Sequence, residues 1–239
     1  MADVNPAPVT LPRRLLAEAI GTGLLVTVVV GSGIAAQQLS PGNTGLQLLE
    51  NSTATVFGLA VLILMFGPVS GAHFNPVVTA ADWLLGRRTR TGISGVHVAP
   101  YIAAQTVGAI AGAILANAMF ALPLVEISGT DRATLGHGIG EVVATAGLIA
   151  VIVALARTGR ASLSAAAVAS WIGAAYWFTS STSFANPAVT IARMLSDTFA
   201  GIAPASVPGF VGAELLGAVL AVGLVWWLYP RRGDTRDRL

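Results

Sequence analysis

The sequence contains neither cysteine nor lysine, and only 10% of its 239 residues are charged. The absence of cysteine excludes disulfides, zinc–thiolate sites and cysteine nucleophiles. The formal net charge of +2 comes from arginine alone, and the arginines lie in short clusters between apolar segments, a pattern that does not indicate nucleic-acid binding. With 54% hydrophobic residues and a mean hydropathy of +0.75, the chain has too little charged surface for a soluble protein of this size. It is expected to be a membrane protein.

Apolar runs long enough to cross a bilayer, which takes roughly 20 residues each, recur along the chain. We place them at 14–36, 50–68, 95–121, 138–157, 161–180 and 207–230. Two shorter apolar pieces, 75–86 and 186–196, are too short to cross. The first run is too long for the apolar core of a cleaved signal, so we expect it to be retained as a spanning helix.

The arginines indicate how the chain is oriented. If the chain crosses the membrane six times, nearly all of them fall on one side: Arg13, Arg14, Arg87, Arg88, Arg90, Arg157, Arg160, Arg231, Arg232, Arg236 and Arg238. The loops on the opposite side contribute only Arg132. Because positively charged loops stay in the cytoplasm, we expect both termini to be cytoplasmic.

The two halves of the sequence resemble each other at three places in the same order. The matching stretches are "AEAIGTG" (17–23) with "GEVVATA" (140–146), "NPVVTAA" (75–81) with "NPAVTIA" (186–192), and "YIAAQTVGAIAGA" (101–113) with "FVGAELLGAVLAV" (210–222). This alignment pairs Glu18 with Glu141 and Gln105 with Glu214. It predicts a duplicated three-span unit, repeat one over 13–121 and repeat two over 138–230. Because each unit has an odd number of crossings, the second lies upside down relative to the first.

Each short apolar piece begins with Asn-Pro, which places asparagine at a helix N-cap and proline at the first helical position. The pair alone is weak evidence, since Asn5-Pro6 occurs in the polar N-terminal stretch. Two copies at equivalent places in an inverted repeat predict two re-entrant half-helices that enter from opposite faces and meet start to start. Irregular backbone at that depth is tolerated only where it is buried or lines a watery cavity. The preceding stretches "GPVSGAHF" and "SSTSFA" are therefore expected to present carbonyls to a cavity.

With these motifs in place, the chain resembles the aquaporin and glycerol-facilitator (major intrinsic protein) family. The resemblance rests on "SGAHFNPVVT", "ANPAVT", the paired glutamates and "YIAAQTVGAIAG" with "GAELLGA". It implies one channel domain over 13–230, flanked by tails at 1–12 and 231–239, with six spanning helices, two half-helices and a pore in each protomer of a homotetramer. The implied pore constriction consists of Asn75, Pro76, Val77, Asn186, Pro187 and Ala188, with Val77 in place of the family's alanine.

The resemblance also implies a selectivity filter, and here the chain departs from the family. Arginine usually follows the second motif, but this position is Val189. Counting without gaps from the motifs places the other filter positions at Thr55, Ala174 and Ser183, which predicts a wide, uncharged ring without large aromatic side chains. Arg193 lies one helical turn beyond Val189. Its side chain either reaches back to restore a positive filter, or it extends to the outer interface or pairs locally; we favour the second arrangement.

The predicted function is passive conduction of small neutral solutes. The family resemblance implies glycerol and urea, with water as a further solute. The filter without arginine is most similar to bacterial members associated with arsenic resistance, which implies efflux of arsenite or methylated arsenicals. Two helix starts that point at one constriction oppose cations, because each carries about half a positive charge. The resemblance assigns Glu18 and Glu141 to supporting the re-entrant loops, and we expect His73 to pack in the first loop and not to bind a metal. No cofactor or nucleic-acid partner is expected, and the surroundings are the lipid bilayer of a bacterial inner membrane.

Three alternatives are open at this point. The first is a water-selective channel in which Arg193 replaces the filter arginine. The second is an intramembrane hydrolase with Ser70 as nucleophile and His73 as base, which needs a hydrogen-bonded pair and leaves the repeat unexplained. The third is an ion-coupled transporter, which also uses inverted repeats and would draw on Asp82 and Arg193.

Overall fold

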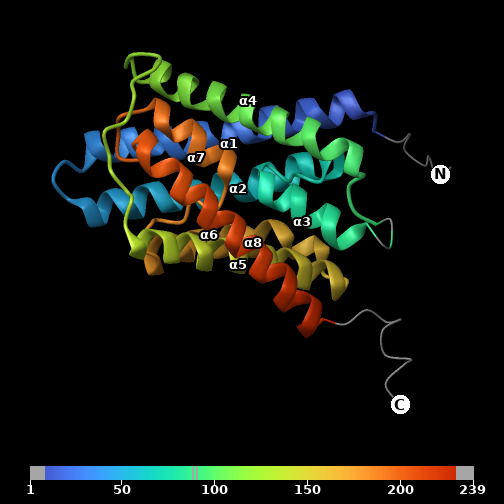
Figure 1. Ribbon diagram of the computed structural model, residues 1–239. Helices are drawn as coiled ribbons and strands as arrows, with labels where there is room; N and C mark the ends of the chain where they lie inside the picture. The colour runs from blue at the N-terminus through green and yellow to red at the C-terminus, as the bar shows by residue number, and fades with distance from the viewer. Residues whose placement is uncertain (1–8, 88, 90, 230–239) are drawn as a thin grey trace.

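In the computed structural model, which describes residues 9–87, 89 and 91–229, every regular element of the described residues is helical (Figure 1). The elements are α1 (Leu11–Leu39), α2 (Thr44–Ser70), α3 (Pro76–Gly86), α4 (Gly95–Met119), α5 (Leu135–Arg157), η1 (Ala161–Leu163), α6 (Ser164–Phe178), α7 (Pro187–Ala192), η2 (Arg193–Leu195), η3 (Pro204–Ser206) and α8 (Val207–Leu228). Among the described residues, six helical segments are long and apolar enough to cross a membrane: α1, α2, α4, α5, η1–α6 and η3–α8. The prediction of an all-α, multi-pass membrane protein is confirmed.

The helix bounds follow the predicted apolar runs with small shifts at the ends. Helix α2 begins at Thr44, ahead of the apolar run, because the side chain of Asn43 caps it by accepting a hydrogen bond from the Leu46 N–H at 3.0 Å. Helix α1 begins at Leu11, so the end of the predicted tail is helical; Pro12 lies in the first turn, where its missing N–H leaves no helical bond unmade. Residues 1–8 and the C-terminal tail at 231–239 lie outside the described part of the chain.

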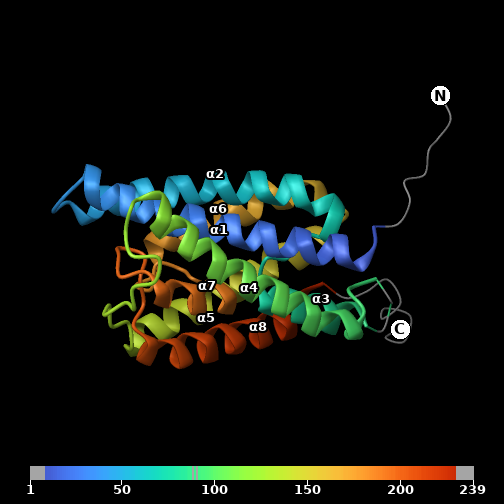
Figure 2. The same cartoon turned by 90° about the horizontal axis from the view of Figure 1, so that it is seen from above.

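The long helices pack as the duplicated sequence requires. Helix α1 packs along α4 and α5 packs along α8, while α2 and α6 join the two halves. The α1–α4 contact depends on glycine: a Cβ at Gly108 would overlap the carbonyl oxygen of Ala19, and one at Gly112 would overlap that of Gly23. Small residues spaced by four let two membrane helices approach this closely. The half-helices α3 and α7 lie among the long helices in both views (Figures 1 and 2).

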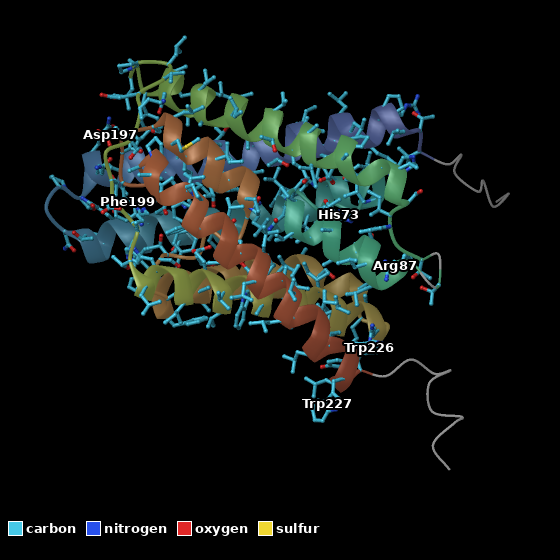
Figure 3. The ribbon with its side chains drawn as sticks, in the orientation of Figure 1. His73, Arg87, Asp197, Phe199, Trp226 and Trp227 are labelled. Carbon is cyan, nitrogen blue, oxygen red and sulfur yellow. The ribbon has the colours of Figure 1, made fainter. Side chains whose placement is uncertain are left out.

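The two ends of the bundle differ in charge. Helix α1 begins and α8 ends at the same end (Figure 1), where Figure 3 also shows Arg87 and, on the outside of α8, the exposed side chains of Trp226 and Trp227. Arg13 and Arg14 belong to this end through the first turn of α1. The opposite end holds the α1–α2 and α4–α5 connections and the loop with Asp197 and Phe199 (Figure 3). Arg88, Arg90 and the C-terminal arginines lie outside the described residues.

Candidate functional site

The two half-helices meet start to start through Asn75 and Asn186. The Nδ2 of Asn75 donates to the carbonyl oxygen of Ala185 at 2.7 Å, and the Nδ2 of Asn186 donates to that of Phe74 at 2.8 Å. Each Oδ1 caps its own helix, Asn75 by accepting from the Val77 N–H at 3.0 Å and Asn186 from the first turn of α7. The fold thus brings two helix N-termini, each with about half a positive charge, to one place.

The loop before each half-helix has a strained backbone with the same pattern. Ala72 and Phe74 in the first repeat have φ of 49° and 51°, and Ser183 and Ala185 in the second have 53° and 48°. Left-handed backbone costs a non-glycine residue about 1–3 kcal/mol and persists only where the surroundings hold it. Phe74 and Ala185 are also the residues whose carbonyls accept from the opposite asparagine, so the strain aims these carbonyls across the repeat.

One buried glutamate holds each strained loop. Glu18 accepts from the His73 N–H at 3.0 Å and the Phe74 N–H at 2.7 Å. Glu141 accepts from the N–H groups of Phe184 and Ala185 at 2.9 and 2.6 Å. Both carboxylates are fully buried, where charge-assisted hydrogen bonds are short and strong. These carboxylates thus accept hydrogen bonds from buried loop N–H groups that have no partner in a helix or a sheet.

Ser70 and His73 do not form a nucleophile–base pair. The Ser70 Oγ donates to Glu18 Oε1 at 2.6 Å, whereas the His73 Nδ1 lies 3.1 Å from the Thr79 Oγ1 and its Nε2 lies 3.9 Å from the Asp82 carboxylate. His73 is labelled in Figure 3, beside the start of α3. The geometry that a hydrolase needs is therefore missing, and the histidine side chain belongs to the wall of a cavity.

A cavity of about 1250 Å³ extends from the arginine-rich end of the bundle past both asparagines. At that end its wall includes Arg14, Asp82 and His97, and it reaches Asn75 and Asn186 deeper inside. The other predicted constriction residues do not line it: Pro76, Val77, Pro187 and Ala188 are buried behind the asparagines. The reason is that they form the first turns of α3 and α7, so their side chains pack into the protein while the caps face the cavity.

A second cavity of about 380 Å³ lies on the other side, and its wall includes Thr182, Arg132 and Phe199. The walls of the two cavities share no residue, although Ser183 belongs to the first and its neighbour Thr182 to the second. Thr182 and Ser183 therefore lie between the two cavities, and we refer to the protein beside these two residues as the narrow region.

Three of the four predicted filter residues lie at this end of the first cavity. Thr55, Ser183 and Val189 line it, and each is less than 5% exposed. The Ser183 Oγ is buried without a hydrogen-bond partner in the described protein. The described protein therefore leaves the hydrogen-bonding capacity of this hydroxyl unmet.

Ala174 is not part of this wall, and its place is taken by Tyr176. Ala174 is exposed on the outer surface of α6, whereas Ile172 and Tyr176, one helical turn apart, both face the cavity. The Tyr176 hydroxyl lies 3.2 Å from the Thr55 Oγ1. A large aromatic side chain therefore lies beside Thr55 in the cavity wall. A shift of two residues along a helix turns a side chain by about 200°, and ungapped counting through the loop at 179–185 produced that shift.

Arg193 lies inside the protein and not at the outer interface. It is 2% exposed and lines the first cavity. Its Nε donates to the carbonyl oxygen of Ala200, and its guanidinium carbon lies 3.3 Å from the centroid of the Phe184 ring. Helix α7 ends at Ala192, and Arg193 begins a 3-10 turn. The side chain of Arg193 therefore points in a different direction from the one that a continuing α-helix would give it. The wall that contains Thr55, Ser183 and Val189 thus also contains a guanidinium group.

The α4–α5 connection folds over the same end, a contact that the sequence did not indicate. The Arg132 Nε donates to the Gly201 carbonyl at 2.8 Å, and its guanidinium carbon lies 5.3 Å from the Phe184 ring centroid. Burial lowers the pKa of Arg132, and the charge of Glu141 partly offsets this effect. Asp131 accepts from the Ala133 N–H and the Ser206 hydroxyl, and these hydrogen bonds lower the pKa of its carboxyl group. A second arginine therefore borders the narrow region from outside.

Comparison with known proteins agrees with this architecture. A family model described as Major intrinsic protein matches residues 7–181. The chain is 50% identical over 228 residues to the aquaglyceroporin AqpS of Rhizobium meliloti (strain 1021), covering 95% of each protein. It is 30% identical over 246 residues to the probable aquaporin AqpM of Archaeoglobus fulgidus, covering 92% of this chain and 96% of the relative. The X-ray structure of the aquaglyceroporin from Plasmodium falciparum has the same fold, with a TM-score of 0.63 at 20% identity, over 90% of this chain and 96% of that one.

Proposed function

The chain belongs to the major intrinsic protein family, and from this premise we propose that it is a passive channel for small neutral solutes such as glycerol. The observation that carries the proposal is the reciprocal pair of hydrogen bonds from Asn75 and Asn186, made in the wall of one cavity. Each side-chain amide has a second N–H, which is available to a passing solute. Conduction of this kind depends on pore width, lining groups and electrostatic barriers and is not an enzymatic reaction.

Charge explains why the solutes are neutral. The two helix starts together place about one positive charge beside the asparagines, and Arg193 adds another in the same cavity wall. A cation or hydrated proton is repelled at both places. A neutral solute feels no such barrier and gains hydrogen bonds from the amides.

The lining at the narrow end favours solutes with both hydroxyl groups and an apolar face. Tyr176, Thr55 and Ser183 provide hydroxyls, while Val189 provides an apolar surface in the same wall. Glycerol fits this combination, and the description of AqpS as an aquaglyceroporin supports it. We extend the proposal to urea and to the uncharged hydroxides of arsenic, arsenite and methylated arsenicals, which are small and polar. The second candidate is a water-selective pore, favoured by the buried guanidinium of Arg193 beside the narrow region.

The proposed setting is the inner membrane of a bacterium, with both termini in the cytoplasm. Its support is the asymmetry of the arginines: Arg13, Arg14 and Arg87 lie at one end of the bundle and Arg132 at the other. The positively charged end is cytoplasmic by the positive-inside rule. A homotetramer with one pore in each protomer is proposed from the family resemblance, and native mass spectrometry of the detergent-solubilised protein tests it.

The absence of cysteine provides a direct test of the path. Stopped-flow light scattering on proteoliposomes measures the permeation of water, glycerol, urea and arsenite, before and after addition of mercuric ion, which binds strongly to thiolates. The wild type is expected to conduct glycerol and to be insensitive to mercury. Val189→Cys is expected to become mercury-sensitive, and Ala174→Cys, on the outer surface, is the matched control.

Each outcome of this experiment is informative. Conduction of glycerol that mercury blocks only in Val189→Cys supports both the function and the path. Rapid water flux without glycerol flux favours the water-selective candidate. Uphill accumulation driven by a proton or sodium gradient would contradict a passive channel and favour an ion-coupled transporter.

A further inference from the structure

The second repeat contains a buried carboxyl group, that of Glu214, which does not line the first cavity. Glu214 of α8 is fully buried, and it lies beside Glu141, because the two carboxyl groups accept from the adjacent N–H groups of Asn186 and Ala185. Its Oε1 accepts from the Asn186 N–H at 3.0 Å and from the Thr190 hydroxyl at 2.6 Å. Glu214 thus holds the residue that caps α7, while Glu141 holds the two residues before it.

Two adjacent ionised carboxylates cannot satisfy each other, because both are acceptors. Glu214 Oε2 is also buried without a hydrogen-bond partner among the described residues. A buried charge is tolerated when it is paired and fully hydrogen-bonded, and a second negative charge next to Glu141 meets neither condition. Two carboxyl groups in one buried site commonly share a proton for this reason.

In the first repeat, the position equivalent to Glu214 is occupied by a neutral side chain. Gln105, the counterpart of Glu214, donates from Nε2 to the Glu18 carboxylate at 2.7 Å. Its Oε1 is likewise buried without a partner. The inverted repeat therefore already contains one neutral side chain that supplies a hydrogen to the loop-holding glutamate and leaves one oxygen unbonded.

We propose that Glu214 is a positioning residue that retains a proton at neutral pH, so that Glu141 and Glu214 share one negative charge and together hold the second re-entrant loop. A single proton between the two carboxyl groups replaces the amide N–H that Gln105 gives to Glu18. The proton state itself is independent of what the pore conducts, and the effect on conduction rests on the proposed channel function.

Two arginines lie near the carboxyl pair, and both donate to backbone carbonyls. Arg193 interacts with Glu141 and Glu214, and Arg132 interacts with Glu141, while the Nε atoms of the two arginines donate to the carbonyl oxygens of Ala200 and Gly201. On α5, His137 lies against Phe210, and Arg157 binds backbone carbonyls at the far end of α8. Neither α7 nor η3 has an ionisable side chain.

Asp82, the acidic residue of α3, accepts a hydrogen bond from the Ile93 N–H. Loss of the shared proton at alkaline pH leaves two adjacent negative charges in a buried site. Their repulsion weakens the hold on Asn186 and on the loop before it. Conduction is therefore expected to be constant through neutral pH and to fall when the pair is deprotonated.

The proton can be observed without any measurement of transport. Infrared difference spectroscopy of the full-length protein in liposomes detects the carbonyl stretch of a protonated carboxylic acid. At neutral pH the wild type is expected to show this band. Glu214→Gln is expected to lose it, and Glu126→Gln, which changes an exposed carboxyl group, is expected to keep it. The absence of any such band in the wild type would overturn the proposal, whether or not the variants fold.

Glycerol permeation then tests the positioning role. Glu214→Ala leaves the Asn186 N–H and the Thr190 hydroxyl without partners, and permeation is expected to fall by about tenfold or more. Glu214→Gln is expected to restore most of it and to remove the loss at alkaline pH. If Glu214→Gln is as impaired as Glu214→Ala while monodisperse, an ionised carboxylate is required and the proposal is wrong. If the wild type shows the band but conducts no glycerol, the channel function fails and the shared proton stands.

Discussion

Replacement of Arg193 by methionine should make the pore leak protons while leaving the passage of glycerol largely intact. The guanidinium lies in the cavity wall, with its Nε on the carbonyl oxygen of Ala200 and its plane over Phe184. Methionine has a shorter but comparably bulky side chain and no charge, so the variant removes the electrostatic barrier without opening a large space. Of the two arginines that interact with Glu141, only Arg132 then remains.

The size of the effect follows from the place of the charge. A cation that passes about 5 Å from the guanidinium at an effective dielectric constant of about 20 is repelled by roughly 3 kcal/mol. Because 1.4 kcal/mol corresponds to a factor of ten, proton flux is expected to rise by about 100-fold. Glycerol is neutral, so its permeation is expected to change by only a few-fold, in either direction.

The assay uses proteoliposomes with an entrapped pH-sensitive dye, an imposed pH gradient and stopped-flow glycerol uptake on the same preparation. Arg193→Lys, which keeps the charge, is expected to remain proton-tight. Arg160→Met is the matched control, because Arg160 is exposed at the other end of the bundle. If Arg193→Met conducts glycerol normally but its proton flux stays within about twofold of the wild type, the half-helix dipoles suffice and the role given to Arg193 is refuted.

Three further predictions concern the wall, the loop and the packing. Tyr176→Ala should raise the permeation of polyols larger than glycerol, whereas Ala174→Leu on the outer surface should change it little; equal effects in the two variants would contradict the assignment of Tyr176 to the wall. Glu141→Ala leaves two buried N–H groups unpaired, at about 1–3 kcal/mol each, and should lower both glycerol flux and the temperature of unfolding in detergent. Gly112→Leu, which forces a side chain against Gly23, should prevent α1 and α4 from packing and abolish monodisperse protein, while Gly138→Ala, in open space, should not.

The fold was largely predictable because it depends on patterns that stay within one stretch of chain. In lipid, every backbone polar group must be hydrogen-bonded within the protein. This requirement leaves patterns that can be recognised in the sequence: six long apolar runs, a repeated Asn-Pro, and the pairing of Glu18 with Glu141. Counting residues along a helix is reliable only as long as the helix continues. That condition holds near the asparagine caps, and Ser183 and Val189 do lie in the cavity wall.

Counting residues along a helix fails where the helix ends and the chain turns. The left-handed residues before α7 change the phase between the loop and α6, which moves the wall position from Ala174 to Tyr176. The 3-10 turn after α7 changes the direction of Arg193. Docking of the α4–α5 connection, with Arg132 against Gly201, joins segments far apart in sequence and leaves no local pattern.

Composition, apolar length and internal repetition thus establish a membrane protein with an inverted pair of half-helices, because a bilayer imposes the same demands on any such sequence. The tertiary structure alone decides which side chains line the narrow region and what charge they have. A cavity wall is assembled from several elements, and the angle at which each side chain enters depends on turns and packing that no single segment encodes. The buried carboxyl pair of Glu141 and Glu214 shows both contributions: the repeat reveals the two positions, and only packing brings them close enough to share a proton.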